Sequence, residues 1–443
     1  MTPRRPLVAA RWAYVAVVAL ATLTDLHLSG DLHRAAHRLA RAFEPSIGWR
    51  DAIDGLRNVA LFAGLGAVWV LTTLTGQVTR EIRRATLVGL ALSATVEGAQ
   101  VFSPVRSASV VDLATNTFGA FAGAAVMAAL VFETQRARGA RSYLGLPATL
   151  LAVGYGLAVL CEAMVPLFQS TPVPGIEGGP LTSLRTVLGT AGFAPGFEQL
   201  YDAVLFPPAA FLAVMALAER GEGGGRDASR VWWRVAIAGA LLMLVAELAH
   251  GAYRLPISWG AAALHAAAVA LGAWAAGRWL APLSRAFRGG ERARLALVGY
   301  AVLLVVWAWR PLYPETDLGH IVAQLTPEHL VPLRALAEQQ DVFSALHVAQ
   351  QCVLYLPLGA LLAVWPLRLA GRWSHLWPAL WLAVVLEAGH LLIAGRFLDL
   401  TNALLACAGL AIGWVTVRRS GYRPYGAAWP PPAVAGRGAP RQV

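Results

Sequence analysis

The sequence contains no lysine, few charged residues and only three cysteines among its 443 residues. All 36 basic side chains are therefore arginine, which excludes Schiff-base or general-base chemistry by a lysine. Charged residues make up 14% of the chain, whereas a typical soluble domain carries about 25%. The cysteines, Cys161, Cys352 and Cys407, stand far apart inside apolar runs, without metal-site spacing. We expect them to be packing residues.

What the sequence does contain is apolar: 57% of its residues are hydrophobic. Runs of nearly 20 such residues recur along the whole length, and about 20 apolar residues span the roughly 30 Å of a bilayer core. The net charge of +11 fits arginines in cytoplasmic loops better than a nucleic-acid partner. We predict an all-α, polytopic membrane protein whose partner is the lipid bilayer, with no nucleic acid.

The apolar runs predict about twelve transmembrane helices, at residues 12–28, 56–74, 85–102, 108–132, 144–168, 203–217, 231–250, 257–279, 295–309, 348–367, 376–393 and 398–417. An amphipathic piece, residues 32–43, could lie on the bilayer surface. The tail, residues 421–443, is rich in Pro, Gly and Arg, and we expect it to be disordered and cytoplasmic.

One stretch, residues 93–123, brings polar residues together where two apolar runs meet. Glu97 and Gln100 are three residues apart and share a helix face, as do Asp112 and Asn116, which are four apart. Each ionisable residue costs about 2.5–3.5 kcal/mol at the centre of a membrane helix. The candidate polar site therefore consists of Ser93, Glu97, Gln100, Arg106, Asp112 and Asn116.

These residues form motifs with a defined order. Asn58-x-x-Leu61-Phe62-x-x-Leu65-Gly66 is followed by Ser93-x-x-x-Glu97-x-x-Gln100, by Arg106, and by Asp112-x-x-x-Asn116-x-x-Gly119-x-x-x-Gly123. The pattern resembles the VanZ-like family of bacterial membrane proteins, whose founding member is associated with teicoplanin resistance. The resemblance implies a role at the cell envelope, but it supplies no biochemical mechanism.

The same layout returns twice, which predicts three four-helix repeats. We call them unit 1 (residues 1–140, with the complete motif), unit 2 (141–290, degenerate) and unit 3 (291–420, partly degenerate). Units 1 and 3 align at a constant offset of 290 residues between Glu97 and Glu387 and between Arg106 and Arg396. The supporting residues are Asn58, Glu247, His250, Arg254, Glu387, His390, Arg396 and Asp399.

The later units depart from the unit 1 pattern. In unit 3, Asn402 stands where unit 1 has Asp112, and Ala406 where it has Asn116. Glu-x-x-His, at His250 and His390, is half of a metal site in some helical bundles. Unit 1 has Gln100 at that place, so we expect neither a metal nor a cofactor. Whether units 2 and 3 are functional or scaffold stays open.

Arginine counting predicts the orientation. The N-terminus, the loops after every second and fourth helix, and the C-terminal tail hold 25 of the 36 arginines. The arginine-rich side of a membrane protein is cytoplasmic. We therefore expect a multi-pass protein of the inner (plasma) membrane with both termini in the cytoplasm. Every Glu-to-Arg turn is then expected at the outer face.

Two interpretations of the polar stretch remain. It could be an ion-paired knot that pins two helices, or a pocket that grips a polar head group or performs acid–base chemistry. The leading function is action on envelope components, such as envelope lipid or glycopeptide head groups, or resistance to glycopeptide-type antibiotics. The alternatives are a multi-span transporter or flippase, and a membrane enzyme acting on lipid-linked envelope precursors. Whether the protein is an enzyme is left open.

Overall fold

The structure is a computed structural model, and it describes most of the chain between residues 5 and 419. The described residues are 5–23, 29–43, 49–73, 77–104, 108–136, 143–144, 146–164, 180–189, 192, 200, 203–220, 228–252, 255–287, 289–310, 313–323, 325, 331, 342–364, 377–394 and 396–419. The predicted disordered tail, residues 421–443, lies outside them.

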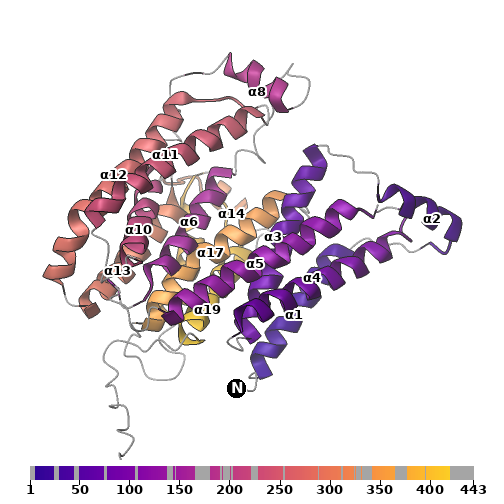
Figure 1. Cartoon of the computed structure of the whole chain (residues 1–443). Coiled ribbons are helices and arrows are strands. Elements are labelled where there is room, and N and C mark those ends of the chain that lie inside the picture. The colour runs from indigo at the N-terminus through magenta and orange to yellow at the C-terminus, as the bar shows by residue number, and fades with distance from the viewer. Residues whose placement is uncertain are drawn as a thin grey trace, which may run out of the picture.

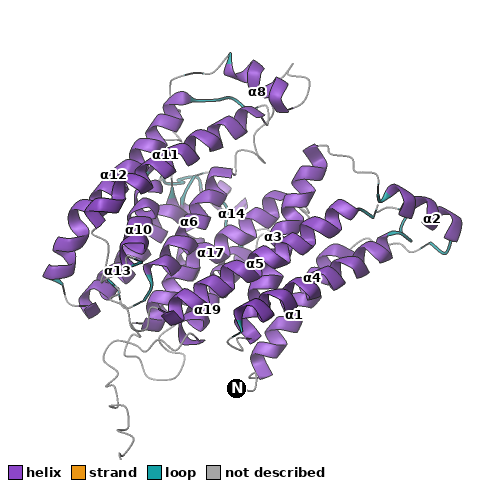
Figure 2. Ribbon diagram, in the orientation of Figure 1, coloured by secondary structure: helices purple, strands orange, loops and turns teal. Residues whose placement is uncertain are grey.

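The described residues are almost entirely helical, and they contain no strand longer than an isolated bridge (Figure 2). The helices are α1 (Arg5–Leu23), α2 (Leu32–Arg41), α3 (Trp49–Thr73), α4 (Val78–Gln100), α5 (Val110–Arg136), α6 (Ala148–Met164), α8 (Pro180–Leu188), α10 (Phe206–Glu219), α11 (Ala228–Ala252), α12 (Trp259–Ala286), α13 (Gly289–Trp309), α14 (Leu318–Ala323), α17 (Val342–Val364), α18 (Trp377–Gly389), the 3₁₀ turn η3 (His390–Leu392) and α19 (Leu400–Arg419). Each of the twelve predicted apolar helices coincides with one of these.

Within unit 1, α3 packs along α5, while α4 lies against both and α1 against α3 and α4. Three glycines, Gly66, Gly119 and Gly123, make the α3–α5 contact close. A Cβ on Gly119 would lie 2.5 Å from the Val59 carbonyl oxygen, and one on Gly123 would lie 1.9 Å from that of Ala63. Only glycine permits this backbone approach, which is how helices pack tightly where lipid gives no hydrophobic drive.

The same close packing joins α17 to α19 in unit 3. A Cβ on Gly409 would lie 2.1 Å from the Cys352 carbonyl oxygen, and one on Gly413 would lie 2.0 Å from that of Leu356. In unit 2, α12 approaches α10 in this way at Gly272, over the Pro207 carbonyl.

Helix α17 lies at the centre of the molecule (Figure 1) and contacts α3, α6, α13 and α19. The largest hydrophobic cluster of the described residues surrounds it, with the fully buried Tyr155, Leu304 and Leu361 among its members. Ile412 on α19 also packs against the cluster formed by α3, α4 and α5. Units 2 and 3 therefore share one core, and Ile412 links it to the separate cluster of unit 1.

The outward surfaces of several helices are apolar. On α11, for example, Ile237, Leu241 and Val245 are all more than half exposed. Among the described residues, six helices are long and apolar enough to cross a membrane: Val110–Phe132, Ala228–Gly251, Trp259–Ala286, Gly290–Trp309, His347–Val364 and Leu400–Arg419. Shorter apolar helices are Asn58–Thr73, Ala148–Ala163, Phe206–Glu219 and Trp377–Leu392. The prediction of an all-α, polytopic membrane protein is confirmed.

Candidate functional site

The turn between α4 and α5 is held by Glu97. One of its carboxylate oxygens accepts a hydrogen bond from the backbone N–H of Ser109, at 2.8 Å. Ser109 precedes the first residue of α5, and its hydroxyl accepts from the N–H of Val111, at 3.1 Å. A helix N-terminus leaves several N–H groups unpaired and carries a partial positive charge, so a carboxylate there is stabilising.

The same contact recurs in units 2 and 3. Glu247 accepts from the Ser258 N–H at 2.6 Å, and Glu387 from the Asp399 N–H at 2.7 Å. In both cases the residue bonded to the glutamate caps the following helix: Ser258 accepts from Ala261 N–H at 3.2 Å, and Asp399 from Thr401 N–H at 2.8 Å. Each glutamate of the sequence pattern thus contacts the start of the fourth helix of its unit.

Unit 1 contains further polar contacts behind this turn. The Asn58 amide on α3 donates to the Asp112 carboxylate at 2.8 Å, and the Asn116 amide donates to the Ser93 hydroxyl at 2.9 Å. Ser93 and Asn116 are buried, with exposed fractions of 0% and 2%. These contacts tie α3 and α4 to α5.

The Asn116 amide is only partly satisfied. Its Oδ1 is buried and has no hydrogen-bond partner among the described residues. Exchanging its oxygen and nitrogen would leave the NH₂ group unpaired instead, because Ser93 faces one of the two atoms. A buried polar atom of this kind costs about 1–3 kcal/mol, so the position is one where a ligand or a water would be stabilised.

The residues three positions after Glu97 and Glu387 reach the end of the first helix of their unit. The Gln100 amide donates to the Thr22 carbonyl at 3.4 Å, and Nε2 of His390 lies 3.0 Å from the Ala308 carbonyl oxygen. Nδ1 of His250 lies 3.5 Å from Glu247, as Nδ1 of His390 lies 3.3 Å from Glu387.

The structure describes one of the three arginines of the sequence pattern. Arg106 and Arg254 lie outside the described residues. Arg396 is described, and its Nε donates to the backbone carbonyl of Arg310 at 2.9 Å. The ion-paired knot expected in the polar stretch, which would join Glu97 to Arg106, therefore stays a prediction.

Residues 29–43, which include α2, cover the α4–α5 turn. The Ser29 N–H donates to the Phe102 carbonyl at 2.8 Å, and the Val110 N–H donates to the Ala42 carbonyl at 3.1 Å. Between them, Ala35 of α2 packs against the turn. The amphipathic piece expected on the bilayer surface thus contains helix α2, which contacts the turn. Leu32 and Leu39 of the helix, and Phe43 beyond its end, stay exposed.

Sequence reasoning missed one tyrosine in the first helix of each unit. The hydroxyl groups of Tyr14, Tyr155 and Tyr300 donate to the carbonyl groups of Leu61, Leu205 and Leu354, respectively, at 3.2, 3.0 and 2.6 Å. Each of these three leucines stands immediately before an aromatic residue: Phe62, Phe206 or Tyr355. A tyrosine recurring in the first helix of every unit was the signal available in the sequence.

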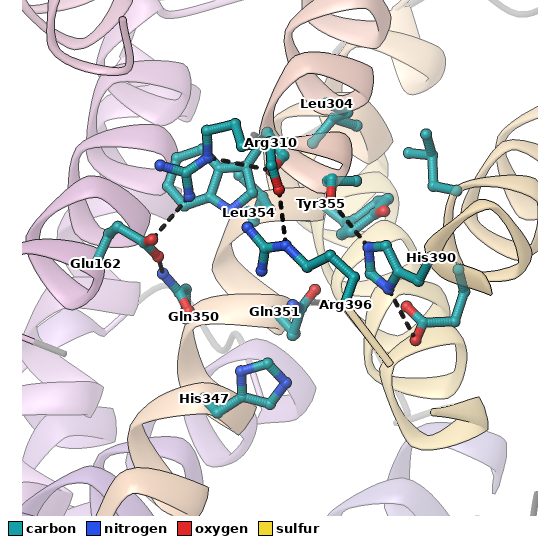
Figure 3. A pocket seen from close by; sticks show the side chains of 14 residues that line it. Glu162, Leu304, Arg310, His347, Gln350, Gln351, Leu354, Tyr355, His390 and Arg396 are labelled. Atoms are coloured by element: carbon teal, nitrogen blue, oxygen red, sulfur yellow. Dashed lines mark hydrogen bonds and ion pairs between the residues drawn. The ribbon is translucent and has the colours of Figure 1, made fainter. Parts of the chain in front are cut away.

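The structure also contains a polar cavity of about 220 Å³, the unit 3 cavity, which is lined by residues of unit 3 and by Glu162 of unit 2. Figure 3 shows side chains from α6, α13, α17 and the turn before α19 pointing toward one another in it. Its lining residues are Glu162, Leu304, Trp307, Ala308, Arg310, His347, Gln350, Gln351, Leu354, Tyr355, Leu386, Glu387, His390 and Arg396. Only Glu387, His390 and Arg396 belong to the site residues predicted from sequence.

Helices with apolar outer faces, joined by turns that hold the polar residues, define a multi-pass helical membrane protein. Residues 11–132 match the family model VanZ/LLP1. The comparisons with curated proteins and with solved structures found no match. The resemblance predicted from sequence is thus confirmed for unit 1, and the matched region does not extend to units 2 and 3.

Proposed function

We propose that the polar site of unit 1 lies at the outer face of the cell membrane and acts on cell-envelope components, giving resistance to glycopeptide-type antibiotics. The site comprises Ser93, Glu97, Gln100, Arg106, Asp112 and Asn116. The observation that carries the proposal is the half-satisfied Asn116 amide, buried beside Ser93. A cluster that only held the helices together would not need a buried amide oxygen without a partner. A polar head group or a bound water would pair with that oxygen.

The wider architecture that we propose is three VanZ-like units with twelve membrane spans. Its support is the recurrence of contacts at aligned positions: the tyrosine-to-carbonyl bond, the glutamate at the helix start, and the glycine contacts of the second and fourth helices. Both termini are then cytoplasmic, as the arginine distribution indicates.

Units 2 and 3 differ from unit 1 in the residues behind the turn. In unit 3, Asn402 takes the place of Asp112 and bonds Glu387 at 3.2 Å, and Ala406 takes the place of Asn116. We infer that the glutamates of all three units serve the fold, and that unit 1 alone carries the envelope-directed site.

The test is antibiotic susceptibility of a host that expresses the wild type, Asp112→Asn or Glu97→Gln. Asn keeps an oxygen that can accept from Asn58, so Asp112→Asn should leave stability within about 1 kcal/mol of wild type while abolishing the resistance phenotype. Glu97→Gln likewise keeps an acceptor for Ser109 and should lose the phenotype.

The matched control is Asp399→Asn, the same chemical change at the corresponding turn of unit 3. Asn caps helices as well as Asp, so this variant should keep both stability and phenotype. Unchanged susceptibility on expression of the wild type, or equal loss in Asp112→Asn and Asp399→Asn, would contradict the proposal.

A further inference from the structure

Arg11 lies at the end of unit 1 opposite the Glu97 turn. Near the start of α1, its guanidinium contacts Trp69, which is close to the end of α3. The Gln100 amide contacts Thr22 near the other end of α1. Figure 1 shows the N-terminal end of α1 far from α2, the helix that covers the Glu97 turn. The surroundings of Arg11 are therefore separate from the candidate polar site.

Two tryptophan rings hold the Arg11 guanidinium. Its Cζ atom lies 4.5 Å from the centroid of the Trp69 ring and 5.7 Å from that of the Trp12 ring. The two rings meet edge to face, with their centroids 6.2 Å apart. A cation over an aromatic ring is attracted by the quadrupole of that ring. The rings therefore fix the position of the guanidinium without neutralising its charge.

Both partners of the closer stack contain a hydrogen-bond donor without an acceptor. Nε of Arg11 and Nε1 of Trp69 are buried, and neither has a hydrogen-bond partner among the described residues. An arginine or an indole nitrogen can only donate. Within the described part of the chain, Arg11 also forms no ion pair, and its contacts are the two rings. The group that this cluster lacks is an acceptor with a negative charge.

The charge on the neighbouring start of α4 is positive. Ile82, in the second turn of α4, packs against the same hydrophobic cluster as Trp69. The exposed side chains on these first turns include Arg80, Arg83 and Arg84. Glu81 is the one acid within residues 78–85, and it lies 3.4 Å from Arg84. The summed charge therefore attracts an anion to this end of unit 1 and repels a further cation.

This end of unit 1 also lies at the boundary of an apolar span. Helices α3 and α5 run parallel, because Gly119 and Gly123 approach successive turns of α3 in the same order. Both helices therefore end here, and the apolar span of α5 ends at Phe132. The Trp12 side chain is 54% exposed. Exposed tryptophan beside arginine is typical of the head-group level of a membrane protein.

We propose that Arg11 and Trp69 bind the phosphate of an anionic phospholipid in the leaflet at this end of the protein. The forked guanidinium matches two phosphate oxygens, and the indole N–H adds a donor. Arg11 is partly exposed, so its outer nitrogens reach the lipid while its Nε is covered. The arginines at the start of α4 favour a head group with net negative charge over a zwitterionic one, because they repel its cationic part. Free phosphate would use the same donors but would leave the exposed Trp12 ring without an apolar partner.

The experiment titrates the detergent-purified full-length chain with phosphatidylglycerol and with phosphatidylcholine of the same acyl chains. Native mass spectrometry measures the affinity for the first bound molecule of each lipid. Phosphatidylglycerol should bind about tenfold more tightly, the scale of one charge-assisted hydrogen bond. Inorganic phosphate is tested separately as a competitor, and it should not displace the lipid.

Two variants probe the site. Arg11→Gln removes the charge and the forked donor, and it should abolish the preference for phosphatidylglycerol. Trp69→Phe keeps an aromatic ring but removes the indole N–H, so it should weaken the preference by less, since only a neutral donor is lost. Melting temperatures show that each variant is folded, and Trp69→Phe decides the question should Arg11→Gln fail to fold.

The matched control is Arg234→Gln. Arg234 also stacks on a tryptophan, with its Cζ 5.3 Å from the centroid of the Trp233 ring. Both of these side chains are exposed, and neither contains a buried donor without a partner. Arg234→Gln should therefore retain the full preference for phosphatidylglycerol.

Equal binding of the two lipids, or an unchanged preference in folded Arg11→Gln and Trp69→Phe proteins, would overturn the proposal. An equal loss in Arg234→Gln would show a general attraction between charges and would overturn the assignment to Arg11. Displacement of phosphatidylglycerol by inorganic phosphate would overturn the assignment to a lipid. None of these outcomes depends on the antibiotic phenotype, so this proposal and the function proposed for unit 1 can fail separately.

Discussion

The guanidinium of Arg310, at the end of α13, donates to the carboxylate of Glu162 on α6 across 2.7 Å. The two residues are 148 positions apart and belong to units 3 and 2. Their side chains are 7% and 25% exposed, so solvent screens this pair less than it screens a surface pair. An ion pair inside the shared core therefore links two units that the sequence pattern treats as separate.

Removing one partner of this pair should be destabilising. Glu162→Leu leaves the Arg310 charge buried, and we expect a loss of about 3 kcal/mol in the free energy of unfolding, the lower end for a buried pair because Glu162 is partly exposed. Adding Arg310→Met should recover part of it, with a coupling of about 0.5–3 kcal/mol in the double-mutant cycle. Denaturant unfolding of the detergent-purified variants measures both.

The control for this cycle is the exposed pair of Arg34 and Asp31, whose side chains are 74% and 41% exposed. Arg34→Gln should cost less than about 1 kcal/mol. Additive losses for Glu162→Leu and Arg310→Met would mean that the two side chains do not interact.

Alanine substitutions at two glycines of unit 1 test helix packing and helix propensity separately. Gly123→Ala places a Cβ 1.9 Å from the Ala63 carbonyl oxygen, so α3 and α5 must separate, and we expect a loss of about 1–3 kcal/mol. Gly98→Ala, within α4, meets nothing within 4 Å and should gain about 0.5–1 kcal/mol. Melting temperatures of the two variants test this, and a harmless Gly123→Ala would contradict the close α3–α5 contact.

Removing the tyrosine-to-carbonyl hydrogen bonds should lower the free energy of unfolding by amounts that depend on burial and bond length. Tyr300→Phe removes a buried 2.6 Å hydrogen bond and Tyr14→Phe a partly buried 3.2 Å bond. We expect a loss of about 1–1.5 kcal/mol for Tyr300→Phe and about 0.5 kcal/mol for Tyr14→Phe. Tyr313→Phe, at a side chain that is 48% exposed, is the comparison for an exposed position. Equal unfolding free energies for all three variants would show that these bonds contribute nothing.

The arginine asymmetry predicts the topology. Reporter fusions after Arg84, Arg138 and Arg288 should report the cytoplasm, and fusions at Pro174 and Thr326 the outside, because arginine-rich loops are retained in the cytoplasm. Paired alkaline phosphatase and fluorescent protein fusions at each site make the assignment. Activity of both reporters at the same sites would exclude the twelve-span orientation.

The sequence by itself determined the class of protein and the positions of its helices. Apolar runs of membrane-spanning length are a local property, and they coincide with helices from α1 to α19. The motif around Glu97 and Asp112 identified the VanZ/LLP1 region for the same reason, since its residues lie within two neighbouring helices and their turn. The i, i+3 and i, i+4 spacings that define it are fixed by helix geometry.

Only the tertiary structure decided which groups meet across units. Glu162 and Arg310 pair because α6 and α13 both pack against α17. The unit 3 cavity likewise combines Gln351 with Arg396, from elements separated by α18. Helical periodicity specifies which face of a helix is polar, but it does not specify which distant helix that face will contact. Apolar helices can pack against many partners with similar energy. The close backbone approach at glycines such as Gly413 then selects one partner.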